Sequence, residues 1–216
     1  MIAASVAAIG IAIALYNATE SAPYKNSKIW NFDSYRDNSV PDGFLSMQTG
    51  SGEGTWVIKS DDASVSKPNV FAKLSSDANG STYNIQIMPD GTYTSNSKIS
   101  VKFKIISGQE EQAAGLVFRY NDQNRYLVLI ADAINHRFSL CRAEPEKVIC
   151  TQDKNVDITT GQWHTITAQV AKQGIAGYLD DKLLIQRYDQ HYMKGTIGLW
   201  TKGDSQVYFD DLKIDY

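Results

Sequence analysis

Apolar and polar residues alternate along most of this chain. Within Lys98–Ile106 every second residue is large and apolar, beginning at Ile99, and the residues between them are polar. A period of two with one polar side is typical of a half-buried β-strand. Trp163–Ala171 repeats the pattern, so both segments are predicted to be strands.

Further strands are expected where short apolar runs lie between turn-forming sequences. They are Trp56–Ser60, Asn69–Ser75, Thr82–Ile87, Gly115–Tyr120, Tyr126–Asp132, Arg137–Arg142, Val148–Gln152, Ala176–Leu179, Leu183–Tyr188, Thr196–Thr201 and Val207–Ile214. Turn signals such as Asp180-Asp181 recur about every 8–12 residues, and no long helical period is present. The sequence therefore predicts an all-β protein, a single antiparallel β-sandwich of the jelly-roll type.

The N-terminus has a different composition. Every residue from Ile2 to Tyr16 is apolar or small, with Ser5 as the only hydroxyl before Tyr16, and no Lys or Arg precedes the run. The run is shorter than the ~18–20 residues of a transmembrane helix but suits a signal peptide or a short signal-anchor. We expect residues 1–22 to be this signal or anchor and residues 23–216 to form the domain. The alternative is a buried first element.

Composition excludes several classes of protein. The chain has 216 residues, is 43% hydrophobic and carries a net charge of −3. This is too apolar for a disordered chain, and the charge gives no electrostatic footprint for nucleic acid.

The two cysteines flank a predicted hairpin. If Glu144–Lys147 form a four-residue loop, Cys141 and Cys150 are cross-strand partners and lie close enough for a disulfide. With an export signal, this predicts a disulfide outside the cytoplasm; the alternative is two buried thiols.

Two triplets have the glycosylation pattern, Asn17-Ala-Thr and Asn79-Gly-Ser. We predict Asn79 as the acceptor, because Asn17 lies beside the apolar run.

Several segments resemble concanavalin A-like jelly-roll domains of the LamG-like and family 16-like kinds. The resemblance spans roughly residues 30–216 and rests on Trp30–Asp33, Pro41–Phe44, Thr55–Val57, Ala114–Asp122 with Asn124–Tyr126, Trp163–Ile166, Gly177–Leu184, Gly195–Lys202 and Tyr208–Leu212. It implies the fold and an extracellular domain, and does not specify one activity.

Some relatives of this kind bind glycans and others hydrolyse them. The laminarinase-like hydrolases carry a Glu-x-Asp-x-x-Glu strand, and none of the six glutamates of this chain forms that motif. Glu110 and Glu111 are adjacent, so on a strand they would point to opposite faces, whereas paired-carboxylate hydrolysis needs two carboxyls facing each other. The Asn-Ser-Gly signal of relatives that act on oxidised disaccharides is not evident either.

Candidate ligand-binding residues come from strand faces and a turn. Leu116, Phe118 and Tyr120 are expected in the core, which would place Arg119 on the opposite, groove-bearing face. The other candidates are Trp200 and a polar group near the end of the next strand and its turn, formed by Asp132, Asn135, His136 and Arg137. Planar polar groups and aromatic faces suit sugar hydroxyls and C–H faces. Structural ion pairing of Arg119 and packing of Trp200 are the alternatives, and His164 is expected to be a core histidine.

A structural Ca²⁺ is suggested by the resemblance, because such domains often hold one between the last strand and the N-terminal segment. Asp33, Asp210 and Asp211 are the candidate ligands. The spacing from Phe209 to Leu212 also predicts a β-bulge at the aspartate pair. The alternative role for the aspartates is solvation and protection of a sheet edge.

The function favoured by the sequence is a secreted or surface-anchored domain that binds carbohydrate without catalysis, with membrane attachment through residues 2–16 as one option. A glycoside hydrolase or lyase with a non-standard carboxylate pair, and a purely structural cell-surface domain, are the alternatives.

Overall fold

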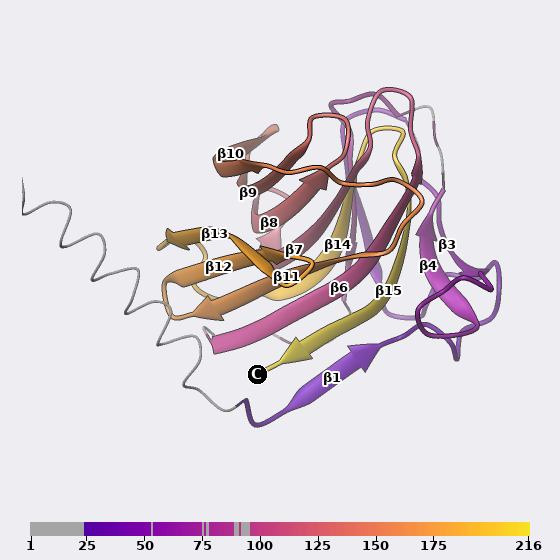
Figure 1. Cartoon of the computed structure of the whole chain (residues 1–216), viewed down its shortest axis with the longest axis horizontal. Coiled ribbons are helices and arrows are strands. Elements are labelled where there is room, and N and C mark those ends of the chain that lie inside the picture. Colours follow the sequence, from indigo (N-terminus) through magenta and orange to yellow (C-terminus); the bar gives the residue numbers. More distant parts are fainter. Residues whose placement is uncertain (1–23, 53, 75, 77, 89–90, 92–95) are drawn as a thin grey trace, which may run out of the picture.

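The computed structural model describes residues 24–52, 54–74, 76, 78–88, 91 and 96–216, and shows two antiparallel β-sheets packed face to face (Figure 1). The predicted leader at residues 1–22 and the sequon at Asn17 lie outside the described residues. No helix in the described part of the chain is long and apolar enough to cross a membrane.

Sheet A has eight strands, which run in the order β13-β12-β11-β6-β15-β4-β3, with β1 also paired to β15. These strands are β1 (Ser27–Trp30), β3 (Trp56–Ser60), β4 (Asn69–Lys73), β6 (Asn96–Ser107), β11 (His164–Ala171), β12 (Gly174–Leu179), β13 (Lys182–Tyr188) and β15 (Gln206–Asp215).

Sheet B has seven strands in the order β10-β9-β8-β7-β14-β5-β2. They are β2 (Leu45–Thr49), β5 (Tyr83–Ile87), β7 (Ala113–Asp122), β8 (Arg125–Asp132), β9 (Arg137–Glu144), β10 (Lys147–Asn155) and β14 (Thr196–Lys202). The two sheets confirm the predicted all-β sandwich.

The main core lies between the sheets and follows the predicted alternation. In β6, residues Ile99, Val101 and Phe103 point inward and are at most 2% exposed. His164 is mostly buried, as expected: its Nδ1 lies 2.7 Å from Asp180 Oδ2 and its Nε2 lies 3.0 Å from the Thr159 carbonyl oxygen.

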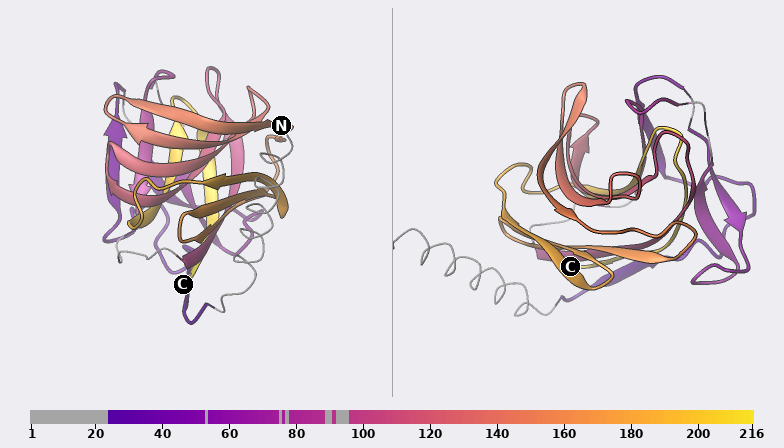
Figure 2. Two further views of the ribbon diagram at one scale, coloured as in Figure 1. Left: turned by 90° about the vertical axis from the view of Figure 1, so that its left-hand side faces the viewer. Right: turned by 45° about the horizontal axis from the view of Figure 1, so that its top comes forward.

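A second apolar cluster covers the face of sheet B that turns away from sheet A, here called the concave face. The sheet is strongly curved, and its edge strands rise on either side of this face (Figure 2, right). The cluster includes Ile85, Val117, Val128 and Trp200, each at most 1% exposed. Partly buried side chains pack against this cluster: Met47, Tyr83, Tyr120 and Val148.

The predicted disulfide is present. Cys141 and Cys150 are register partners in β9 and β10 and are joined by an S–S bond. The predicted bulge at the aspartate pair is also present, since the pairing of β15 with β6 shifts between Asp210 and Lys213.

Candidate functional site

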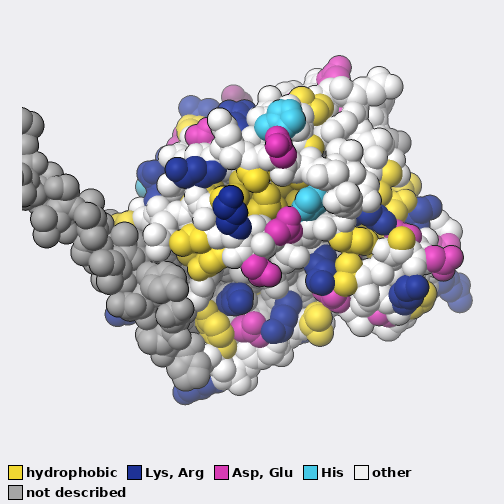
Figure 3. Space-filling model, viewed as in Figure 1, with side chains coloured by type: hydrophobic (Ala, Val, Ile, Leu, Met, Phe, Trp, Pro, Cys, Tyr) yellow, Lys and Arg dark blue, Asp and Glu magenta, His cyan; other side chains and the backbone are white. Residues whose placement is uncertain are grey.

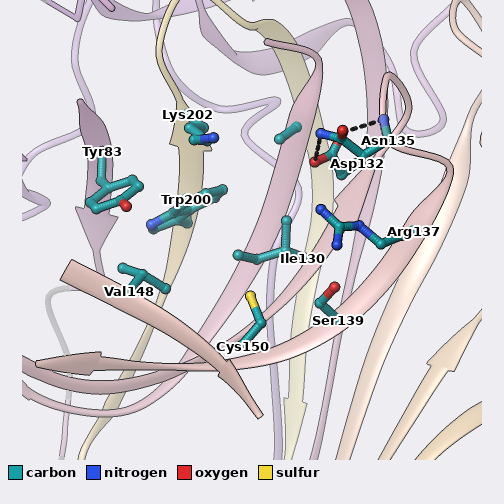
Figure 4. A pocket seen from close by; sticks show the side chains of 11 residues that line it. Tyr83, Ile130, Asp132, Asn135, Arg137, Ser139, Val148, Cys150, Trp200 and Lys202 are labelled. Atoms are coloured by element: carbon teal, nitrogen blue, oxygen red, sulfur yellow. Dashed lines mark hydrogen bonds between the residues drawn. The ribbon is translucent and has the colours of Figure 1, made fainter. Parts of the chain in front are cut away.

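A small hollow, here called the polar pocket, lies at one end of the concave face (Figure 4). It encloses about 130 Å³. Its lining comes from six of the seven strands of sheet B and the β8–β9 turn: Tyr83, Ala113, Ile130, Asp132, Asn135, Arg137, Ser139, Val148, Cys150, Trp200 and Lys202. A ligand here would touch side chains that only the folded sheet brings together.

One side of the polar pocket is aromatic. Tyr83 of β5 is stacked on Trp200 of β14, with ring centroids 5.4 Å apart and planes 27° apart. The indole fits because Gly115 has no side chain: a Cβ there would lie 3.1 Å from Trp200 Cε3 and 2.9 Å from Val128 Cγ2. Trp200 is only 1% exposed, so Tyr83 presents the accessible aromatic surface.

The opposite side is polar, as Figure 4 shows. Asp132 accepts hydrogen bonds from the Asn135 amide and side chain, at 3.0 Å and 2.8 Å, which fixes the carboxylate at the pocket edge. Arg137 follows on β9, and its guanidinium lies 3.9 Å from Asp153, beyond hydrogen-bonding distance. Arg137 therefore keeps N–H groups for a ligand.

Charge is balanced around the polar pocket. Lys202 pairs with Glu111 at 2.6 Å, and Asp132 is the only carboxylate among the described lining residues. A balanced set of donors and acceptors suits neutral hydroxyl groups. Charged side chains are also interspersed over the face seen in Figure 3, without a large patch of one sign.

Burial keeps the central tyrosines of the concave face neutral. It raises the pKa of Tyr126 far above the usual value, and it raises the pKa of Tyr120, with a further contribution from nearby Asp122. Both hydroxyls therefore remain protonated at physiological pH.

The polar pocket brings together four of the predicted ligand-binding residues, Asp132, Asn135, Arg137 and Trp200. His136 lies next to them in sequence but not in the lining, and its Nδ1 is 3.0 Å from Asp157 on the surface. Tyr83 and Lys202 were not predicted. The alternation within Thr82–Ile87 places Tyr83 with Ile85, but sequence does not show that β5 pairs with β14.

The expected orientation of Arg119 is wrong. Arg119 has a left-handed backbone with φ 52°, and the β7–β8 register shifts between Phe118 and Asp122. This bulge exchanges the faces of two residues: Arg119 is 5% exposed and donates to backbone carbonyls, whereas Tyr120, expected in the core between the sheets, packs against the concave-face cluster.

Two of the three aspartates predicted to hold Ca²⁺, Asp210 and Asp33, accept hydrogen bonds from protein donors. Asp210 is fully buried and accepts hydrogen bonds from the amides of Val65, Ser66 and Asp211 and from the Ser66 hydroxyl, at 2.7–3.0 Å. Asp33 accepts from the Asn69 amide instead. Around the Asp210 carboxylate, donor hydrogens occupy the positions that a cation would need.

No cluster of three or more His, Cys, Asp or Glu residues suited to a metal occurs among the described residues. Asp210 instead fastens the loop 61–68 onto the outer face of sheet A. Two further contacts hold that loop: Lys104 with Asp61 at 2.8 Å, and Trp163 Nε1 with the Ala63 carbonyl at 2.7 Å.

The predicted glycosylation residue Asn79 is exposed, and its Oδ1 accepts from the Ser81 amide and hydroxyl at 3.0 Å and 2.6 Å. Glycosylation at Asn79 stays a prediction.

No family model matches the chain, and neither does any curated protein. Solved structures are similar in fold. A carbohydrate-binding module, CBM66 from Bacillus subtilis, superposes with a TM-score of 0.66 at 17% identity, over 81% of this chain and 96% of that chain. A galectin-like protein of unknown function from Bacillus subtilis has a TM-score of 0.58 at 10% identity, covering 87% and 98%.

A β-1,3-glucanase from Mycobacterium marinum has a TM-score of 0.56 at 11% identity, covering 90% and 99%. At these identities the similarity shows the fold alone, a jelly-roll β-sandwich that is also found in carbohydrate-binding and glycosyl hydrolase-like proteins.

Proposed function

We propose that this protein binds a neutral carbohydrate, without catalysis, in the polar pocket. The observation that carries the proposal is the pairing of an aromatic surface at Tyr83 with a polar edge at Asp132 and Arg137 across one hollow. Sugar rings have apolar C–H faces and rims of hydroxyls, so they need both kinds of surface at once. The hollow is below the size range of drug-sized ligand pockets, which suits one sugar ring.

Asp132 and Arg137 also have complementary roles toward neighbouring hydroxyls. A hydroxyl donates one hydrogen bond and accepts others, so adjacent hydroxyls can donate to Asp132 and accept from Arg137. A glycan-binding role agrees with the fold, which a carbohydrate-binding module shares. The disulfide at Cys141–Cys150 favours a location outside the cytoplasm. Export or anchoring through residues 1–22 belongs to the same proposal.

The test is calorimetric titration of the full chain with laminarin, xylan and soluble cello-oligosaccharides, alongside a glycan array. Saturable binding to at least one neutral glycan, weakened in Arg137→Ala, is the expected result. An array without binding above background, from protein with a cooperative melt, would refute the proposal. Release of reducing sugar from any of these polysaccharides would instead establish the hydrolase alternative.

A further inference from the structure

A second hollow, here called the distal hollow, lies at the other end of the concave face. It encloses about 370 Å³, compared with about 130 Å³ for the polar pocket. Its described lining includes Leu45, Ile87, Tyr120, Asn121, Lys194 and Thr196. This volume lies within the range typical of small-molecule sites, so the distal hollow is large enough for a ligand of its own.

The bulge in β7 builds this hollow by turning Tyr120 onto the concave face, where it stacks on Tyr126 with ring centroids 5.9 Å apart. Without the bulge, alternation from Leu116 and Phe118 would bury Tyr120 between the sheets. The aromatic surface in the distal hollow therefore exists only because the strand departs from regular pairing.

Long-range contacts fix the bulge in place. The Arg119 guanidinium donates to the carbonyls of Lys172, His191 and Asp189, at 2.6, 3.3 and 3.4 Å. Gly195 lies against it with φ 156°, and a Cβ there would come within 2.4 Å of the Arg119 carbonyl carbon. Bulges and left-handed residues that the surrounding structure holds this firmly are concentrated near binding sites.

The groups around the distal hollow could contact a sugar chain. Leu45 is 60% exposed, and with Tyr120 it offers an apolar surface. Asn121 Nδ2 donates hydrogen bonds to the carbonyls of Arg119 and Lys194, at 3.0 Å each, which holds the carboxamide in place. The Asn121 Oδ1 and the Lys194 ammonium form no hydrogen bond or ion pair with other described residues, so an acceptor and a donor remain for hydroxyls.

The two hollows are the opposite ends of the same strands. On β14, Lys202 lines the polar pocket and Thr196 the distal hollow; on β5, the corresponding residues are Tyr83 and Ile87. Six residue steps along a strand span about 20 Å. The buried aromatic residues Tyr126 and Trp200 form part of the same face between the two ends.

We propose that the distal hollow is a second subsite for the same glycan, so that the protein binds an extended oligosaccharide lying along β14. The inference rests on the proposed function of the polar pocket. One sugar unit occupies the polar pocket, and a later unit of the same chain packs its C–H face on Leu45 and Tyr120 and directs hydroxyls to Asn121 and Lys194.

A chain-length series tests the subsite. Disaccharides and hexasaccharides of the laminari-, xylo- and cello-series are titrated by calorimetry into the wild-type chain, Leu45→Ala and Arg137→Ala. The matched control is Ile29→Ala, since Ile29 is an edge residue of sheet A that is 55% exposed. For the series that binds, the wild-type hexasaccharide should bind about tenfold more tightly than the disaccharide.

Leu45→Ala should remove most of this gain and leave disaccharide binding unchanged. Ile29→Ala should keep the gain, and Arg137→Ala should weaken both lengths. Equal affinity for both lengths, or a Leu45→Ala effect that is the same for both, would overturn the second subsite and leave the polar pocket standing. If no oligosaccharide binds at any length, the proposed function fails and the subsite fails with it.

Discussion

Asp132 and Arg137 are register partners at the turn end of the β8–β9 hairpin, yet no ion pair joins them within 4 Å. Opposite charges directly across a strand pair usually lie within reach of each other. Here Asn135 holds the carboxylate with two hydrogen bonds, which leaves the guanidinium turned to the polar pocket.

We expect Arg137→Ala to weaken binding of the best glycan by about tenfold or more, because a charge-assisted hydrogen bond is lost. Titration calorimetry measures the change. Arg125→Ala is the matched control, since Arg125 is an exposed arginine paired with Asp122 at 2.7 Å away from the pocket lining. Equal losses in both variants would show that Arg137 has no specific role.

Gly115→Ala should move the Trp200 indole, because the added methyl group would lie 3.1 Å from Trp200 Cε3. Overpacking of this kind lowers the free energy of unfolding by about 1–3 kcal/mol. Urea unfolding and the tryptophan emission spectrum report the stability and the shift of the ring. A variant with wild-type stability and wild-type emission would contradict the tight contact between β7 and β14.

Lys73 should make the protein more stable as the pH rises from about 8 to 10. Its side chain is completely buried, and this burial lowers its pKa to about 8, against the opposing effect of Asp204. Between this value and the ordinary lysine pKa, the unfolded chain binds a proton that the folded protein does not. The free energy of unfolding therefore increases by about 2 kcal/mol over this pH range.

Urea unfolding at several pH values measures this slope, and Lys73→Met should remove it. The range stops at pH 10 because the raised pKa of Tyr126 has the opposite effect above it: the unfolded chain then loses a tyrosine proton that the folded protein keeps. The same slope in the variant and the wild type would rule out Lys73 as its source.

Asp210 should stabilise the protein by accepting four hydrogen bonds and not by binding a metal. Asp210→Asn leaves too few acceptor sites for these donors, so the free energy of unfolding should fall by about 2 kcal/mol or more. EDTA and added Ca²⁺ should leave the melting temperature of the wild type unchanged. A melting temperature that falls with EDTA and is restored by Ca²⁺ would instead support the calcium site implied by the resemblance.

The alternation of apolar and polar residues predicted most strands, because the burial of one strand face depends on residues that are close together in sequence. The strand predicted at Lys98–Ile106 is observed as Asn96–Ser107, and the predicted hairpin correctly paired Cys141 with Cys150. Alternation failed at Arg119, where a bulge depends on three carbonyls from distant loops. No local pattern encodes such contacts.

The binding face was only partly predictable for a related reason. Asp132 and Asn135 lie close in sequence, so the turn that they share can be recognised from the sequence. Tyr83 and Lys202 reach the polar pocket only through the pairing of β5 with β14, which joins segments far apart in the chain. The prediction of a Ca²⁺ site did not include the hydrogen-bond donors that loop 61–68 supplies to Asp210, because that loop is far from Asp210 in sequence.

The pairing of β1 with β15 affects how the protein can be immobilised for binding measurements. Residues Lys25 and Asn26 hydrogen-bond to Tyr216, so the first described residues and the C-terminus lie side by side on sheet A (Figure 1). The concave face belongs to the other sheet. A sensor chip or bead coupled through a tag after Tyr216 would therefore attach to the molecule at sheet A, and both hollows on the concave face would stay open to polymer in solution.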